Sequence, residues 1–330
     1  MDEQNTIGVL DQFQTEFVEF WGRIPNKAFF FVLVLCWLAL FQFFGNPTLG
    51  YVDTPSLFRW MLNSYLARDF EGNLQDDSIG LWVPVLVIGL IWWKQKELVA
   101  EPLKLWSPGI GLVLAGMLFH LVGFFIQQPR LSILGLLLGV YGLIGMAWGR
   151  HFLKAIFFPF FLLLFLIPVS TLIEPITFPL RLLSARIVEW ICQEVLFWNV
   201  LREGTILKDG AGHYQYEVAA ACSGIRSMVA IGLMATVGAF LFFKQWRRRA
   251  VLFALVIPLA VAGNVLRLMT VITAAKLGGQ EWGNWAHEGG PMGIISLLPY
   301  VPAIFGLIYV GQWLEEKKPE ASTAEPAKSA

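Results

Sequence analysis

Three short segments of this 330-residue chain combine the residue types that acyl transfer requires. They are Ala220-Ala221-Cys222-Ser223-Gly224-Ile225-Arg226-Ser227, Gly263-Asn264-Val265-Leu266-Arg267, and Trp285-Ala286-His287-Glu288-Gly289-Gly290-Pro291. A cysteine thiolate can attack a carbonyl, an imidazole can accept and return protons, and a guanidinium can stabilise an oxyanion. Cys222, His287 and Arg267 are therefore candidates for a single cysteine acyl-transfer site.

The predicted position of each residue supports this interpretation. Cys222 is predicted to open a membrane helix, where partial positive charge and unpaired N–H groups favour the thiolate. Ser223 and Gly224 allow close approach of another backbone, and Arg226 lies one turn further along the helix. Asn264 precedes Arg267 by three residues and shares its helix face.

Each signal also has an ordinary explanation. Cys222 could be a buried cysteine in a helix interface built from small residues. Arg267 could extend to the lipid head groups or pair with a structural carboxylate. His287 could be a solvated loop histidine. The convergence of all three on one membrane face favours a shared site.

Composition defines the class of protein that must position these residues. Of the chain, 56% is hydrophobic and only 15% is charged, whereas soluble domains carry about 25% charged residues. This excludes a typical soluble enzyme, a disordered chain and a disulfide scaffold. The 24 basic and 24 acidic residues give zero net charge, so no nucleic-acid partner is expected. Three scattered cysteines provide no metal framework, and neither a metal nor a cofactor is expected.

Apolar segments predict an all-α polytopic membrane protein with eight transmembrane helices in a domain covering 28–313. A bilayer core about 30 Å thick requires roughly 20 apolar residues per helix. The predicted spans are 28–44, 79–93, 108–126, 131–148, 152–172, 223–243, 250–275 and 293–313. Residues 1–27 form a cytoplasmic N-terminal segment without a cleavable signal, and 314–330 form a disordered cytoplasmic tail.

Lysine and arginine in short loops predict the orientation. The basic clusters before the first span, after the second, fourth and sixth spans, and after the eighth all fall on one side, which is cytoplasmic by the positive-inside rule. Both termini are then inside, and the outer loops are 45–78, 173–222 and 276–292. At a rise of about 1.5 Å per residue, Arg267 lies near the outer end of its span.

The longest outer loop, 173–222, is expected to carry two small elements. Residues 175–198 are apolar but contain four charged residues, which favours an amphipathic helix lying on the outer leaflet. Residues 199–221 are divided by glycines into short alternating runs, which predicts a small β-hairpin. Cys192 in this loop could pair with Cys222 in an oxidising compartment, although such a disulfide would silence the nucleophile.

These motifs, in this order and on this membrane face, resemble the exosortase/archaeosortase family of membrane cysteine transpeptidases. The resemblance rests on Ala221-Cys222-Ser223-Gly224 with Arg226-Ser227, on Gly263-Asn264-x-x-Arg267, and on His287 before the last span. It covers roughly 28–313. The histidine at the last position favours the bacterial exosortase branch.

The resemblance implies a role for each residue and a class of substrate. Cys222 would be the nucleophile, Arg267 the transition-state stabiliser and His287 the acid/base. Ser223, Arg226 and Asn264 are expected to bind substrate or support these groups. Partners would be exported proteins with a C-terminal sorting signal, made of a short motif such as Pro-Glu-Pro, a transmembrane helix and a basic cluster. A membrane lipid or lipid-linked acceptor would receive the acyl group, at the outer face of the bacterial inner membrane.

A transporter or channel remains a rival interpretation, because prolines in the spans and an intramembrane arginine are also typical of transporters. A protein that handles lipid carriers or supports an assembly is a second rival. No internal repeat is evident, and the polar groups gather at one face of the membrane, which favours the enzyme.

Overall fold

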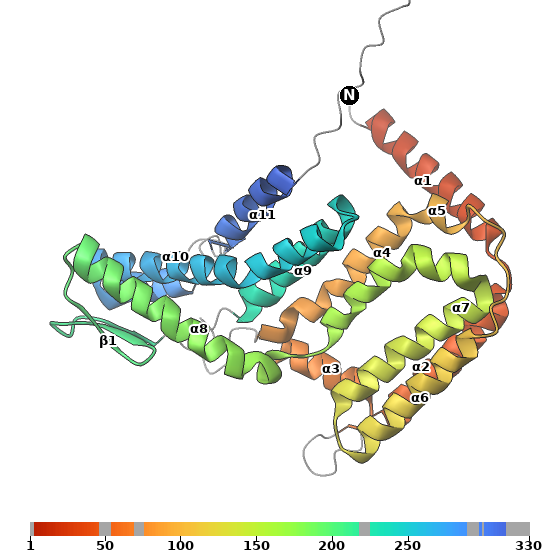
Figure 1. Ribbon diagram of the computed structural model, residues 1–330, viewed down its shortest axis with the longest axis horizontal. Coiled ribbons are helices and arrows are strands. Elements are labelled where there is room, and N and C mark those ends of the chain that lie inside the picture. Colours follow the sequence, from red (N-terminus) through yellow and green to blue (C-terminus); the bar gives the residue numbers. More distant parts are fainter. Residues whose placement is uncertain are drawn as a thin grey trace, which may run out of the picture. The chain divides into compact units, whose positions relative to one another are not determined.

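The computed structural model describes residues 3–45, 54–68, 76–217, 225–288, 297–298 and 300–314. The chain divides into two compact units, an N-terminal unit (Met1–Glu174) and a C-terminal unit (Pro175–Ala330). Both are built mainly from helices, and the C-terminal unit also contains a small sheet (Figure 1). The predicted fold class, a helical protein with a small β element, is therefore confirmed.

Within the described residues, three helices are long and apolar enough to cross a bilayer. They are Lys27–Phe44, Pro129–Leu166 and Trp246–His287. Three shorter apolar helices accompany them, at Asp77–Trp93, Gly109–Phe125 and Met228–Phe242. A helix lies on every predicted span, but eight membrane crossings remain a prediction, because several of these helices are shorter than a bilayer core requires.

The N-terminal unit consists of a series of helices joined by short connections. Its elements are α1 (Glu3–Arg23), α2 (Lys27–Phe44), α3 (Leu57–Leu66), η1 (Asp76–Leu81), α4 (Val83–Trp93), α5 (Gln95–Leu98), α6 (Gly109–Phe125), α7 (Pro129–Phe161) and η2 (Leu162–Leu166). The helix α1 occupies most of the segment predicted only as a cytoplasmic N-terminus.

Helix α7 contains the boundary predicted between the fourth and fifth spans. It is interrupted at Gly149, where φ is 95° and ψ is 177°. Residues with a side chain rarely adopt this left-handed φ, and a Cβ at this position would lie 2.3 Å from the Lys104 carbonyl oxygen. The second half of α7 leads into η2, which ends at Leu166, so the fifth helix is shorter than the predicted 152–172.

The packing of α6 against α7 depends on facing glycines. A Cβ at Gly116 would lie 2.7 Å from the Gly135 carbonyl oxygen, and a Cβ at Gly135 would lie 2.5 Å from the Gly116 carbonyl oxygen. In apolar surroundings, small residues of this kind let two helix backbones approach closely. His120 of α6 is 2% exposed, and its Nδ1 lies 3.1 Å from Ser132 Oγ of α7, so this buried histidine has a hydrogen-bond partner in the helix interface.

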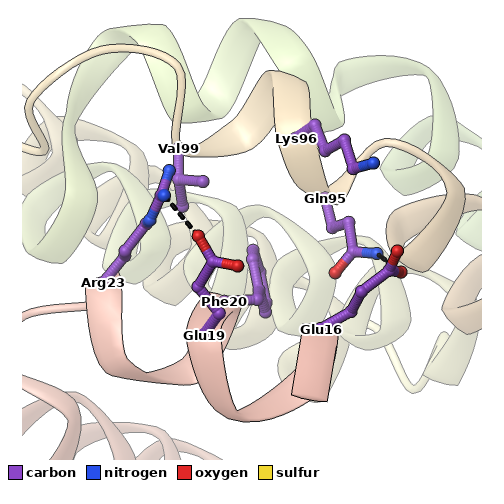
Figure 2. Close-up of a pocket in the computed structure, with 7 residues that line it drawn as sticks. All are labelled: Glu16, Glu19, Phe20, Arg23, Gln95, Lys96 and Val99. Atoms are coloured by element: carbon purple, nitrogen blue, oxygen red, sulfur yellow. Dashed lines mark hydrogen bonds and ion pairs between the residues drawn. The ribbon is translucent and has the colours of Figure 1, made fainter. Parts of the chain in front are cut away.

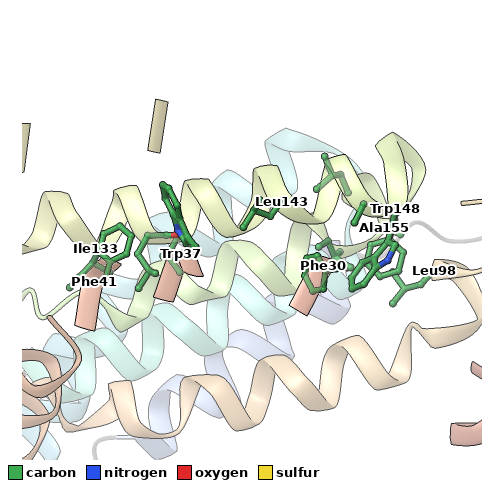
Figure 3. Close-up of a cluster of buried hydrophobic side chains, with 14 of the residues drawn as sticks. Phe30, Trp37, Phe41, Leu98, Ile133, Leu143, Trp148 and Ala155 are labelled. Atoms are coloured by element: carbon green, nitrogen blue, oxygen red, sulfur yellow. The ribbon is translucent and has the colours of Figure 1, made fainter. Parts of the chain in front are cut away.

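A continuous apolar cluster fills the N-terminal unit along α2 and α7 (Figure 3). The Trp37 ring of α2 occupies the space above Gly139, where a Cβ would come within 2.1 Å of it. Its indole N–H donates to the Leu136 carbonyl at 3.1 Å. At the other end of the cluster, the Trp148 N–H donates to the Pro25 carbonyl, also at 3.1 Å. Both buried indoles thus satisfy their only donor.

The boundary between the units falls within α8 (Ser170–Trp190), which continues into the π-helical turn η3 (Ile191–Val195) of the C-terminal unit. These elements cover most of the predicted amphipathic segment. A three-stranded antiparallel sheet follows, in the order β1 (Val200–Glu203), β2 (Ile206–Asp209) and β3 (Gln215–Glu217). The predicted two-stranded hairpin was therefore incomplete, since the chain turns a second time after Asp209 and adds β3.

The remaining helices of the C-terminal unit are α9 (Ile225–Phe242), α10 (Trp246–His287) and α11 (Tyr300–Leu314). They share small buried clusters, one of them formed by Ile231, Ala260 and Ala303. The prediction of an outer loop over 276–292 was wrong for residues 276–287, because α10 is helical up to His287 apart from a break at Gly278 and Gly279.

The glycine contact between α6 and α7 leads to a stability prediction. Gly116→Leu should lower the free energy of unfolding by about 1–3 kcal/mol, because the new side chain forces the two backbones apart. The measurement is unfolding of the purified protein in detergent micelles. Gly111→Leu in the same helix is the matched control, since no atom lies within 4 Å of a Cβ there. Equal stability of the two variants would contradict this account of the interface.

Candidate active site

The structure describes three of the six predicted site residues in full. Arg267, Asn264 and His287 all belong to α10. Cys222 and Ser223 lie outside the described residues, and Arg226 is placed as part of α9 without a described side chain. The geometry of the site can therefore be built from α10 and the elements packed against it.

Arg267 and His287 are brought together although twenty residues separate them. Arg267 Nη2 donates to the main-chain carbonyl of His287 at 3.3 Å. A continuous helix would hold these residues about 30 Å apart at 1.5 Å rise per residue. The contact is possible because the chain reverses between them, and it engages the carbonyl at the helix end rather than the imidazole.

The reversal occurs at two glycines. Gly278 has φ −130° and ψ 16°, while Gly279 has φ 73° and ψ −168°. The second conformation is one that only glycine adopts without strain. Residues 280–287, called the return segment below, then run back beside the preceding part of α10. The Gly278-Gly279 pair is a turn signal that can be read from the sequence. The whole of 276–292 was nevertheless predicted to be a loop.

A third glycine lets the return segment pack closely. A Cβ at Gly283 would lie 2.0 Å from Tyr216 Oη and 2.8 Å from the Ala275 Cβ. Ala286, one turn later, is buried. The return segment therefore fits between the first part of α10 and β3 only because its inner face carries the smallest side chains.

The sheet is joined to the return segment through Gln280. Its side-chain oxygen accepts from the Gln215 main-chain N–H at 3.0 Å, and its side-chain N–H donates to the Gln215 carbonyl at 3.4 Å. The Tyr216 hydroxyl donates to the main-chain carbonyl of Gln280 at 2.8 Å. Sequence reasoning did not select Gln280, Tyr216 or Gly283, because their role depends on the reversal of α10.

An apolar cluster underlies this arrangement. Its buried members come from α8, η3, the sheet and both parts of α10: Ala185, Val188, Cys192, Val200, Leu207, Tyr214, Tyr216, Leu268, Val271, Ile272, Ala275 and Ala286. Cys192 is fully buried, and this burial raises the pKa of its thiol to about 11. A protonated, inaccessible thiol is a poor nucleophile. The alternative of a disulfide between Cys192 and Cys222 involves a residue outside the described part of the chain.

A buried carboxylate fixes the turn between β2 and β3. Asp209 Oδ2 lies 2.7 Å from His213 Nδ1, and Asp209 Oδ1 lies 3.8 Å from Lys276 Nζ of α10. Burial by itself raises the pKa of Asp209, but the hydrogen bonds from His213 and Ala211 and the charge of Lys276 together hold it below its ordinary value. The His213 side chain is 74% exposed and lies at the surface.

Asn264 lies one turn before Arg267 and is buried. It lines a small pocket, with a volume of about 10 Å³, together with Thr177, Arg181 and Ser184 of α8 and Met228 of α9. The expectation that Asn264 lies on the face of α10 that carries Arg267 follows from their spacing. The structure adds that polar side chains of α8 face this amide.

A second polar pocket, in the N-terminal unit, lacks comparable chemistry. It lies between α1 and α5 and is lined by Glu16, Glu19, Phe20, Arg23, Gln95, Lys96 and Val99 (Figure 2). Glu19 pairs with Arg23, and Glu16 accepts from the Gln95 amide at 3.1 Å. The lining contains no cysteine, serine or histidine, so this pocket lacks the groups that a cysteine or serine acyl-transfer site uses.

Metal-binding clusters are likewise missing from the part of the chain that the structure describes: no group of three or more histidine, cysteine, aspartate or glutamate residues could hold an ion.

Comparison with known families supports the same interpretation. The family model described as Transmembrane exosortase (Exosortase_EpsH) matches residues 72–301, which is more than half of the chain and includes Cys222, Arg267 and His287. No curated protein and no solved structure matches the chain.

The Asp209 network leads to a pH-dependent prediction. Asp209→Asn should make the main-chain amides of 200–217 exchange on the order of tenfold faster at pH 7, because charge-assisted hydrogen bonds are lost. Since the pKa of Asp209 is lowered in the folded protein, its stabilisation is full above the ordinary value of 3.8 and disappears as the pH falls through the lowered value.

The difference between wild type and Asp209→Asn should therefore shrink below about pH 3.8. This difference in exchange rate is measured by hydrogen exchange and mass spectrometry, after correction for the intrinsic pH dependence of exchange. Glu203→Gln is the matched control, because the Glu203 side chain is 66% exposed and should have little effect. A difference that does not shrink as the pH falls below 3.8 would rule out the carboxylate as the cause.

Proposed function

Because the chain belongs to the transmembrane exosortase family, we propose that it is a membrane-bound cysteine peptidase and transpeptidase. It cleaves C-terminal sorting signals of the Pro-Glu-Pro type from exported proteins and passes the acyl group to an acceptor through a thioester. The proposal draws its main support from one observation, the contact of Arg267 with the His287 carbonyl, which brings two of the three candidate catalytic residues together.

The proposed location is the outer face of the bacterial inner membrane, with eight spans and both termini in the cytoplasm. Arg267 is near the end of the apolar part of α10, since Lys276 and Glu281 follow within the next fourteen residues. The sheet carries Arg202, Glu203, Lys208 and Asp209, which suits a surface facing water. In this arrangement α8 lies along the outer leaflet, and the sheet covers the site.

In the first half-reaction, the Cys222 thiolate attacks the scissile carbonyl carbon, and a C–S bond forms as the carbonyl electrons move onto oxygen. The Arg267 guanidinium stabilises this oxyanion. The tetrahedral intermediate collapses, the C–N bond breaks, and His287 delivers a proton to the departing amine. The products are an acyl-enzyme thioester and the released C-terminal helix.

In the second half-reaction, an amine or hydroxyl of the lipid-linked acceptor, or water, attacks the thioester. His287 accepts the proton of this nucleophile, the C–S bond breaks, and Cys222 is regenerated as the thiolate. The binding of the Arg267 guanidinium to the His287 main chain holds both groups on one rigid element through the two steps. Charged groups that are held in place before the reaction begins lower the activation free energy of acyl transfer.

The nucleophile is tested by Cys222→Ala. With a co-expressed exported protein carrying a Pro-Glu-Pro tail as substrate, processing should be abolished while the variant accumulates in the membrane at the wild-type level. Cys36→Ala in α2 is the matched control and should process normally. An impermeant maleimide applied from outside should label Cys222 and stop processing.

Two results would overturn this assignment. Normal cleavage by Cys222→Ala would exclude the thiol as nucleophile. Uptake or conductance in vesicles that survives Cys222→Ala, without any processing by the wild type, would favour a transporter.

The guanidinium geometry is tested by Arg267→Lys. Lysine keeps the charge but loses the planar set of donors, so processing should fall by about 10²- to 10³-fold. Arg186→Lys, an exposed position in α8, is the control and should keep wild-type activity. Full activity of Arg267→Lys would show that charge alone is sufficient and would remove the geometric part of the proposal.

A further inference from the structure

Tyr216 is the one residue of the sheet whose aromatic ring faces the candidate acid/base. The ring centres of Tyr216 and His287 are 6.3 Å apart, and their planes are inclined by 25°. Two nearly parallel rings at this distance lie within the range of an offset aromatic pair, which favours one orientation of the imidazole. Tyr216 is 7% exposed, so its ring is held in place by its own surroundings.

The hydroxyl of Tyr216 reaches the other end of the return segment. It donates to the Gln280 carbonyl at 2.8 Å, and the adjacent Gln215 pairs with the Gln280 side chain through two further hydrogen bonds. Burial raises the pKa of Tyr216, so the hydroxyl remains a proton donor. A single side chain thus contacts both the first residue of the return segment and its last.

Gly283 shows that this contact is closely fitted. A Cβ there would lie 2.0 Å from Tyr216 Oη, so the tyrosine passes over the return segment at a point where any side chain would displace it. The neighbouring Tyr214 differs in this respect. It is equally buried, but its hydroxyl has no hydrogen-bond partner within the described residues.

We infer that Tyr216 is a positioning residue, which orients the His287 imidazole through ring contact and fixes the return segment through its hydroxyl. This inference rests on the proposed function, in which His287 transfers protons at the scissile bond. Tyr216 does not touch substrate in this account. It acts through His287, and its loss should therefore lower the rate of chemistry more than the binding of substrate.

The test compares Tyr216→Leu, Tyr216→Phe and Tyr214→Phe, with processing of the co-expressed substrate followed by kinetics in detergent or vesicles. Tyr216→Leu should lower kcat by about 10- to 100-fold with KM nearly unchanged, because a misplaced acid/base loses much of its effect. Tyr216→Phe keeps the ring and should recover most of the rate. Tyr214→Phe, the matched control, should behave as wild type.

A second measurement does not require activity. Exchange of the imidazole C2 hydrogen, followed by mass spectrometry, reports the pH at which His287 titrates. Tyr216→Leu should change this titration, because the ring that lies beside the imidazole is removed. If Tyr216→Leu does not fold, Tyr216→Phe and Gly283→Ala, which displaces the tyrosine, provide the same comparison.

The outcomes separate this inference from the function on which it rests. If His287→Ala is inactive while Tyr216→Leu keeps its kcat and its His287 titration, the positioning role is wrong and the proposed function stands. If His287→Ala processes substrate normally, the proposed function itself fails. A loss of expression or thermal stability in Tyr216→Leu with unchanged kcat and titration would show a purely structural role.

Discussion

The candidate site depends on one reversal of the chain. Gly279 adopts a left-handed conformation that residues with a side chain avoid, and α10 therefore returns beside itself instead of continuing outward. The return converts a separation of twenty residues into a hydrogen bond between Arg267 and the His287 carbonyl. It also creates the surface on which β3 packs, so the sheet, the return segment and the arginine form one connected structure.

Much of this fold could be predicted because it follows from composition and periodicity. Apolar runs gave the positions of α2, α6, α7, α9 and α10, and glycines among short alternating runs gave the β element. Counting charges in loops predicted that Arg267 and His287 lie at the same membrane face; their contact within α10 is observed, whereas the membrane face stays a prediction. The reversal at Gly278-Gly279 was missed, since a glycine pair in a polar stretch is equally compatible with a loop.

The supporting residues could not be found from the sequence for a related reason. Tyr216 and Gln280 are ordinary residues, 64 positions apart, and acquire their roles only when β3 meets the return segment. The same holds for Gly116 and Gly135, whose close contact appears only once α6 and α7 are placed together. Sequence spacing reveals which residues share an element, whereas contacts between elements depend on turns whose geometry a few backbone angles decide.

The pairing of Gln280 with Gln215 has a consequence for how an extended peptide can reach the site. The free edge of a sheet normally offers main-chain donors and acceptors to any strand that approaches. Here the amide of Gln280 already occupies both groups of Gln215, so β3 is closed at that position to pairing by strand addition. Under the proposed function, a peptide that approached β3 would therefore find the main chain of Gln215 already paired, and its side chains would have to contribute at that position.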